Sequence, residues 1–268
     1  MDIATILGIV VFGGLVVLTV FMGEGIAGFK PFLNIEAFFI VMGGTFCALL
    51  VNYTVGQILN VGRVLRKVLI TASDDEYGEI ISVFVQMTTK AKKDGFLSLE
   101  TDIKRIKNDF LKRGLLLVLD GQDQDFIRNM LETELSFIRE RHTVGQDIFN
   151  ALGTYSPAFG IIGTVLGMIL MLNSISDVEE VPRRMALALA AAFYGLGAGY
   201  VIFLPMAGKL KRKSEEELLL KEIIIRGVLL LHSGSTPSVM ESNLKAYIEP
   251  AKRLLVKAAP RATPKTTE

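Results

Sequence analysis

Two membrane-length apolar stretches of this chain carry the residues that could take part in ion chemistry. In the first, Pro157-Ala-Phe-Gly-Ile-Ile-Gly-Thr-Val-Leu-Gly167, steps of three and four residues place Gly160, Gly163, Thr164 and Gly167 on one helix face. Thr164 offers a hydroxyl oxygen, and Pro157 lacks an amide, which frees a carbonyl oxygen. In lipid, a freed carbonyl must find a partner or line a polar cavity. This face is therefore suited to receive a partner's helix and to form one wall of an ion site.

The next apolar stretch has the same character. Its small residues recur at helical spacing and precede a second proline, Pro205. They are Ala188, Ala191, Ala192, Gly195 and Gly199. Small residues let helix backbones approach closely in lipid, so ordinary packing within the chain is the alternative for both faces. Thr164 has a similar alternative, a hydrogen bond to a carbonyl one turn back, and each proline can be a simple kink.

The membrane stretches contain no aspartate, glutamate, histidine, lysine or arginine. Four segments lack charge for the roughly 20 residues that a helix needs to cross a bilayer. They are Ile3 to Gly23, Ala37 to Gly62, Ile148 to Ser176 and Met185 to Gly208. Proton carriers place a titratable group inside the bilayer. If this protein conducts protons, a partner must therefore supply the carboxylate.

Composition favours a membrane protein without enzymatic activity. Half of the 268 residues are hydrophobic, and the mean hydropathy of +0.44 exceeds that of typical soluble domains. His142 and His232 are far apart, Cys47 is a lone cysteine, and no nucleophile, phosphate-loop or metal-ligand motif is present. We expect no cofactor, no metal site and no nucleic-acid partner, and we expect contact with membrane lipid.

Charge predicts the orientation of the spans. Basic residues gather after the second span, before the third and after the fourth: Arg63, Arg66, Lys67, Arg139, Arg141, Lys209, Lys211, Arg212 and Lys213. By the positive-inside rule these ends are cytoplasmic, as are both termini. We therefore divide the chain into spans one and two with a short outer loop (1–62), a cytoplasmic helical domain (63–147), spans three and four (148–210), and cytoplasmic helices with a disordered tail (211–268).

The pattern throughout is helical, so we predict an all-α fold. Ser73-Asp74-Asp75 offers N-caps for a helix that ends at Asp94-Gly95, and a second helix repeats Ile103, Ile106 and Phe110 before Asp120-Gly121. A third helix begins near Asp123 and has no proline before Pro157, so it can run into the membrane. The fourth span is expected to continue to Leu231. Gly234 to Pro237 then breaks it, a short helix follows to Tyr247, and from Lys257 the tail has few apolar groups.

Several motifs together resemble the flagellar motor stator A-subunit family, the MotA/PomA group. The match spans nearly the whole chain. Its motifs are Met1-Asp2-Ile-Ala-Thr-Ile-Leu-Gly8, Gly43-Gly44-Thr45, Lys92-x-x-Gly95-Phe-Leu-x-Leu-Glu100, Pro157-Ala-Phe-Gly-x-x-Gly-Thr-x-x-Gly, Ala186-x-Ala188-x-x-Ala-Ala-Phe-Tyr194-Gly195, Phe203-Leu-Pro205 and Gly234-x-x-Pro237. Each motif alone is weak, and the set is specific.

The resemblance implies partners and roles. It implies a homopentamer around two copies of a single-span, peptidoglycan-binding B subunit, which brings the membrane aspartate. Lys92 and Glu100, helped by Lys93, would face the rotor switch-ring protein. Pro157, Pro205, Tyr194, Thr164 and Ala192 would belong to the ion pathway, and Gly160, Gly163, Gly167, Gly195 and Gly199 would pack against the partner helix.

The resemblance also bears on the ion and on the alternatives. Sodium-driven members carry threonine at the positions of both Thr164 and Ala192, and the missing hydroxyl at Ala192 favours protons, which need fewer oxygen ligands than a hard cation. Thr154 stands where many relatives have an acidic residue, and Lys92 where some have arginine. An ExbB/TolQ-like energiser of outer-membrane processes and a non-conducting membrane scaffold remain alternatives.

Overall fold

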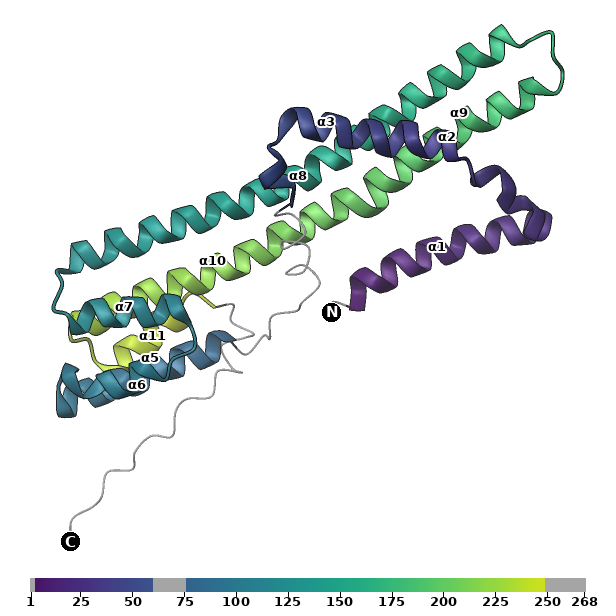
Figure 1. Ribbon diagram of the computed structural model, residues 1–268. Coiled ribbons are helices and arrows are strands. Elements are labelled where there is room, and N and C mark those ends of the chain that lie inside the picture. The colour runs from purple at the N-terminus through teal and green to yellow at the C-terminus, as the bar shows by residue number, and fades with distance from the viewer. Residues whose placement is uncertain (1–2, 60–75, 249–268) are drawn as a thin grey trace. The chain divides into compact units, whose positions relative to one another are not determined.

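The chain folds into helices that form two compact units. A computed structural model describes residues 3–59 and 76–248, and all regular structure in these ranges is helical (Figure 1). One unit comprises 3–59 and 141–213 of the described residues, and the other comprises 76–140 and 214–248. The prediction of an all-α fold is confirmed.

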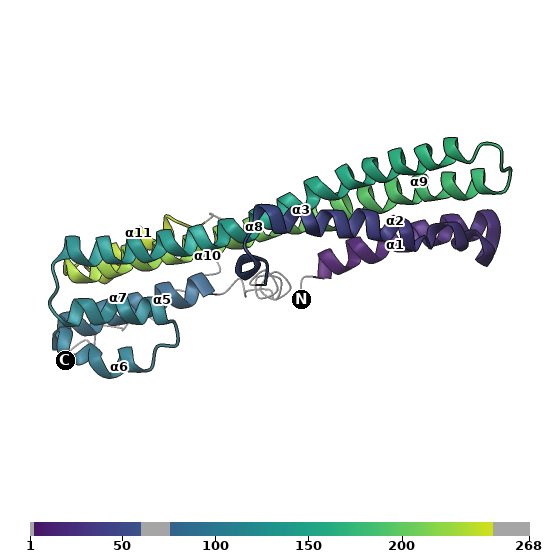
Figure 2. The ribbon, with the colours of Figure 1, turned by 45° about the horizontal axis from the view of Figure 1, so that its top comes forward.

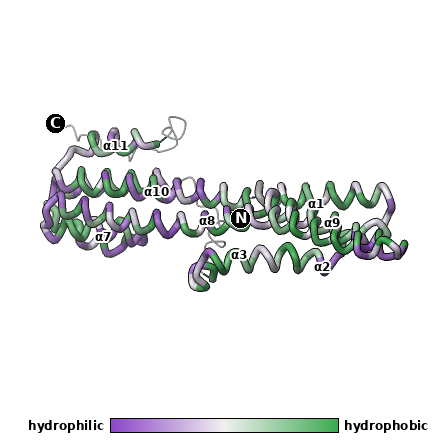
Figure 3. The backbone as a smooth tube through the Cα atoms, turned by 90° about the horizontal axis from the view of Figure 1, so that it is seen from above, coloured by the Kyte–Doolittle hydropathy of each residue, from purple (hydrophilic) through white to green (hydrophobic). Residues whose placement is uncertain are grey.

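The first unit contains the membrane-length helices. Its N-terminal part consists of α1 (Ile3–Glu24), the 3-10 helix η1 (Gly25–Phe32), α2 (Ile35–Phe38), the π-helical η2 (Phe39–Gly43) and α3 (Gly44–Asn52). Its other part consists of α8 (Gln124–Asn173) from Arg141 onward, α9 (Glu180–Leu196), the π-helical η4 (Gly197–Phe203) and the start of α10 (Leu204–His232). Four helical runs are long and apolar enough to cross a membrane, and Figure 3 shows α1 and α9 largely in green.

The second span is shorter than its sequence suggested. We expected it to reach Gly62, but α3 ends at Asn52 and Tyr53 is extended, with φ −128° and ψ 150°. Thr54 and Gln57 explain the break, because they form a capping box. The Thr54 amide donates to Gln57 Oε1 over 2.9 Å, and the Gln57 amide donates to Thr54 Oγ1 over 3.4 Å. Polar caps thus start a new turn inside an uncharged sequence. Residues 60–62 lie outside the described ranges.

Two apolar clusters hold the first unit together. Ala37 and Val41 of the second span pack with Leu187, Ala190 and Ala191 of α9. A second cluster joins Leu49 of α3 to α8 and α10, and its other buried members are Ile148, Phe149, Leu152, Ala207 and Leu210. The span formed by α2, η2 and α3 therefore lies against both of the later membrane helices, as Figures 1 and 2 also show. This arrangement fixes the pair formed by α8 and α9.

The second unit is a helical domain with a large aliphatic core. It contains α5 (Glu76–Asp94), the 3-10 helix η3 (Phe96–Leu99), α6 (Glu100–Lys104), α7 (Asp109–Leu119), α11 (Pro237–Lys245), and parts of α8 and α10. Phe84, Leu111, Leu131 and Ile223 are among its fully buried side chains. The expected turn after Asp94 is present, with Gly95 at φ 77°. The predicted N-caps at Ser73 to Asp75 lie outside the described residues.

One predicted helix of this unit is divided. The pattern from Ile103 to Phe110 suggested a single helix, but α6 ends at Lys104 and α7 begins at Asp109. Asn108 is the reason, because its extended backbone and its side chain, which accepts from the Leu111 amide over 3.0 Å, form an N-cap. The apolar period alone did not reveal this start.

The extents of the two long helices agree with the predictions from the sequence. α8 is continuous over 50 residues and passes through Pro157. α10 ends at His232, close to the expected Leu231, and Gly234 has a φ of 69°. α11 then starts at Pro237 with Thr236 as its cap. The predicted tail from Lys257 lies outside the described residues.

Candidate functional site

The small residues of α8 and α9 form a close helix contact, here called the glycine seam: Gly160, Gly163, Gly167, Ala188, Ala191 and Gly195. A methyl group added at Gly195 would lie 2.6 Å from the Ser156 carbonyl oxygen and 2.8 Å from the Gly160 Cα. One added at Gly167 would lie 2.9 Å from the Ala188 Cα. Backbone thus meets backbone along the seam, and larger side chains would push the helices apart.

Contacts between α8 and α9 of the same chain explain why these positions are glycines. Packing within the chain was the alternative left open by the sequence, and it occupies the faces that we expected a partner's helix to fill. Contact between these glycines and a partner stays a prediction. The α8 side chains beside the seam are exposed in the isolated chain and include Ile161, Val165 and Met168. These residues are the free surface that the chain offers next to its glycines.

Thr164 lies at the edge of the seam. It is half-buried one turn beyond Gly160, and its hydroxyl donates to the Ile161 carbonyl over 2.7 Å. This contact matches the structural alternative for Thr164. The oxygen still has lone pairs that can accept a hydrogen bond or contact a cation. Ala192 lies across the helix contact, with its Cα 3.6 Å from a methyl group built on Gly160, and it adds no hydroxyl to Thr164.

The two prolines are accommodated differently. Pro157 lies within α8, and its missing amide frees the Gly153 carbonyl one turn back. Gly199 packs on both groups, because a methyl group there would lie 2.7 Å from Pro157 Cγ and 2.9 Å from the Gly153 oxygen. Pro205 follows the π-helical η4, whose wider turn leaves room for the proline ring. Neither proline ends its helix.

Tyr194 connects α9 to the N-terminal part of its unit. Its hydroxyl donates to the Phe32 carbonyl and accepts from the Asn34 amide over 3.1 Å. Nearby, Glu36 forms ion pairs with Arg183 at 3.8 Å and with Arg184 at 3.6 Å. The sequence had suggested Tyr194 for the ion pathway only through the resemblance. The structure shows an anchoring role, which sequence spacing could not reveal because the partners are about 160 residues away.

Thr154 offers a hydroxyl in place of the acidic residue of many relatives. This hydroxyl donates to the Asn150 carbonyl over 2.9 Å and satisfies an oxygen of its own helix. Unlike a carboxylate, it carries no charge that could attract a cation.

The predicted rotor residues lie on either side of the turn at Gly95 and of η3 in the second unit. Lys92 and Lys93 are in the last turn of α5, and Glu100 begins α6 after η3. All three are exposed. Within residues 3–59 and 76–248, the structure shows no ion pair for Lys92 or Lys93. The hydrogen bond from Lys104, 2.7 Å long, and its positive charge hold the pKa of the Glu100 carboxyl below its ordinary value. Lys92 and Lys93 therefore present two exposed cations, and Glu100 presents an exposed carboxylate.

Comparison with known proteins decides the family. Residues 102–223 match the MotA/TolQ/ExbB proton channel family. Chemotaxis protein PomA of Vibrio alginolyticus is 34% identical over 255 residues, which are 95% of this chain and 98% of that protein. The chain belongs to the MotA/TolQ/ExbB family, in its MotA/PomA stator group.

Two further relatives show how far the likeness extends. The flagellar MotAB stator complex from Bacillus subtilis contains a chain that superposes with a TM-score of 0.85 and 31% identity, over 94% of this chain and 98% of that one. The uncharacterized protein YtxD of the same species is 34% identical over 92% of this chain and 90% of its own length. The family assignment confirms the resemblance drawn from the motifs. These MotA-family proteins are multi-pass membrane proteins of an ion channel family and are not enzymes.

Proposed function

We propose that this chain is the A subunit of a flagellar stator. Five copies surround two copies of a single-span B subunit that binds peptidoglycan, form a proton channel with them, and convert proton flow into torque on the rotor switch ring. The chain lies in the bacterial inner membrane with both termini in the cytoplasm. The observation that carries the proposal is the likeness to PomA and to the MotAB chain over more than nine tenths of the sequence.

The chemistry of the membrane helices supports the proposal. The stretches 148–176 and 185–208 contain no carboxylate and no basic residue, so the titratable carboxylate must come from a partner. Thr164 and the exposed face beside the glycine seam provide the wall on which that partner's helix packs. One elementary charge that crosses 100 mV yields about 2.3 kcal/mol, which is enough to bias a ring between packed states.

One helix takes part in both units. α8 is unbroken from Gln124 to Asn173, and each unit contains part of it. Its stretch in the second unit contributes Ile127 and Leu131 to the aliphatic core, and its stretch in the first unit contains Pro157 and Thr164. Lys92, Lys93 and Glu100 then act on the rotor through complementary charge, which favours fast and reversible contact.

A motility assay tests the proposal. The chain and its candidate B subunit are produced in a host without stators, and swimming speed is measured. We expect the unchanged chain to restore swimming. The double variant Lys92→Glu with Glu100→Lys should abolish swimming although its level in the membrane is unchanged. Glu76→Lys, a charge change at the other end of α5, should leave swimming intact. Normal swimming of the double reversal contradicts the rotor contact.

The same strain tests the ion and the alternatives. We expect full swimming in sodium-free medium, and paralysis there contradicts proton drive. Restored outer-membrane uptake without swimming, in a strain that lacks its own energiser, indicates the ExbB/TolQ-like role. Absence of proton conductance in every assay, with the complex assembled, indicates a scaffold.

A further inference from the structure

The second unit has an apolar row on α8 that nothing in the described chain covers. Phe126, Met130 and Phe137 are 49%, 51% and 65% exposed, although nearby positions of the helix carry charge. With Thr133 they follow steps of four, three and four residues, which is the spacing of a helix–helix seam. We call Phe126, Met130, Thr133 and Phe137 the α8 strip. Large apolar side chains grouped on a charged helix mark an interaction surface.

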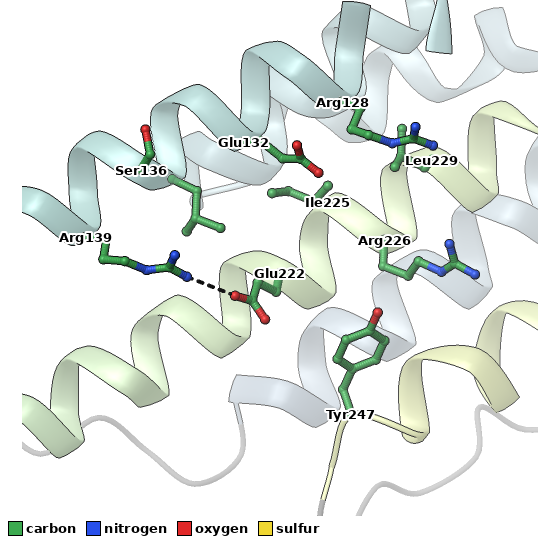
Figure 4. A pocket seen from close by; sticks show the side chains of 10 residues that line it. Arg128, Glu132, Ser136, Arg139, Glu222, Ile225, Arg226, Leu229 and Tyr247 are labelled. Carbon is green, nitrogen blue, oxygen red and sulfur yellow. Dashed lines mark hydrogen bonds and ion pairs between the residues drawn. The ribbon is translucent and has the colours of Figure 1, made fainter. Parts of the chain in front are cut away.

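A groove lies on another face of the same helix. α8 contributes one wall with Arg128, Glu132, Ser136 and Arg139, and α10 contributes the other with Glu222 and Arg226 (Figure 4). The buried side chains of Leu135, Ile225 and Leu229 and the ring of Tyr247 complete its lining. Its volume is about 550 Å³, and the Arg139–Glu222 ion pair of 3.3 Å crosses it. We call this the α8/α10 groove.

The α8 strip and the α8/α10 groove are equally long but lie on different faces of α8. The strip runs from 126 to 137 and the groove wall from 128 to 139, so each covers eleven residue steps, or about 16 Å of helix. The core residues Ile127, Leu131 and Ile138 occupy a third face of α8. A ridge and a groove of equal length on different faces cannot meet within one chain, but they can meet between two copies.

We infer that the α8 strip of one copy of this chain docks in the α8/α10 groove of the next copy. Such a contact is heterologous, and repeated contacts of this kind close into a ring when the rotation between copies allows it. The inference rests on the proposed function, which requires several A subunits around one B pair, and it names the surfaces that join them in the second unit.

The side chains of the α8 strip and of the α8/α10 groove are chemically complementary. The phenyl rings of Phe126 and Phe137 can lie on the guanidinium planes of Arg128 and Arg139, because arginine stacks on aromatic faces. The exposed carboxylates Asp123 and Glu140 lie beyond the two ends of the strip. The groove lining holds three arginines and two glutamates, so it has a net positive charge that complements them.

Disulfide crosslinking between copies tests the inference. In a Cys47→Ala background, Met130→Cys places a thiol on the strip and Ser136→Cys places one in the groove. Both sites are exposed, so the fold tolerates the changes. Oxidation of native membranes that contain the double variant is expected to give a ladder of covalent oligomers on non-reducing gels, and each single variant is expected to stay monomeric.

Tagged copies separate the possible contacts. When one tagged chain carries Met130→Cys and a differently tagged chain carries Ser136→Cys, we expect only mixed dimers. A dimer from Met130→Cys alone shows strip-to-strip pairing and overturns the inference, as does a double variant that remains monomeric. Leu97→Cys with Ser136→Cys is the matched control, because Leu97 is exposed on η3, outside the strip, and it should give no ladder. The readout does not depend on swimming, so a ladder without motility separates a failed stator role from a failed interface.

Discussion

The helices α8 and α9 of the first unit and the helices α5 and α10 of the second pack by different means. In the glycine seam, Gly195 meets the backbone of Ser156 and Gly160. In the second unit, Gly227 also marks a close approach, but it faces the ring of Phe84, which is fully buried. One contact brings two backbones together, and the other makes room for a large side chain.

The difference reflects the two solvents that the units are built for. In lipid, apolar side chains gain little by leaving the solvent, so helices associate through close van der Waals contact between small residues. In water, burial of large aliphatic and aromatic groups drives packing. α8 changes from one mode to the other along its own length. Substitutions in the two regions should therefore cost stability for different reasons.

The largest loss of stability is expected in the aliphatic core. Ile223 is fully buried, so Ile223→Ala leaves a cavity and should cost about 2–5 kcal/mol. This loss of stability is measured by thermal unfolding of the purified chain in detergent and by hydrogen exchange of the α10 amides. Leu97→Ala, at an 81% exposed site, is the control and should change little. An equal effect of the two variants means that the core is not packed as described.

A methyl group in the glycine seam should have the next largest effect. Gly195→Ala drives a Cβ against the Ser156 carbonyl and should cost about 1–3 kcal/mol through overpacking. Gly197→Ala is the matched control, because nothing lies within 4 Å of its added methyl group. Melting temperatures in detergent should fall for the first variant only. Equal melting temperatures argue against backbone contact between α8 and α9.

The anchor of Tyr194 should contribute less. Tyr194→Phe removes the hydroxyl that bonds the Phe32 carbonyl and the Asn34 amide, and about 1 kcal/mol should be lost. Faster proteolysis of the segment between α1 and α2 should accompany the lower melting temperature. Tyr200→Phe, at a 61% exposed ring, serves as control. If both variants behave alike, Tyr194 is no anchor; its place in the ion pathway is a separate prediction.

The smallest effect concerns surface charge in the second unit. Lys104→Ala removes the hydrogen bond that lowers the Glu100 pKa, so this pKa should rise towards its ordinary value. Glu100 then becomes neutral at a higher pH during acidification, while at neutral pH it stays charged in both proteins. NMR titration of the Glu100 carboxyl measures the shift, with Lys93→Ala as control. If the Glu100 pKa rises by a similar amount in Lys93→Ala, the shift comes from the loss of any nearby positive charge and not from the hydrogen bond of Lys104.

Local patterns predicted most of the helices and missed two boundaries. The apolar periods and the turn at Gly95 are sequence-local, and the structure follows them. The breaks after Asn52 and before Asp109 depend on side chains of Thr54, Gln57 and Asn108, whose caps interrupt otherwise helical stretches. Short polar caps carry a weak signal within long apolar or amphipathic patterns, so hydrophobicity alone extends helices through them.

The sequence by itself determined the class of this protein. Uncharged stretches of membrane length, glycines at helical spacing and the ordered set of motifs are properties of the chain alone. Tertiary structure decided which face meets which: Gly160 and Gly195 face each other, Tyr194 holds Asn34, and Phe137 faces outward. A helical period tells which residues share a face but not what lies opposite. That choice depends on contacts between segments that are far apart in the sequence.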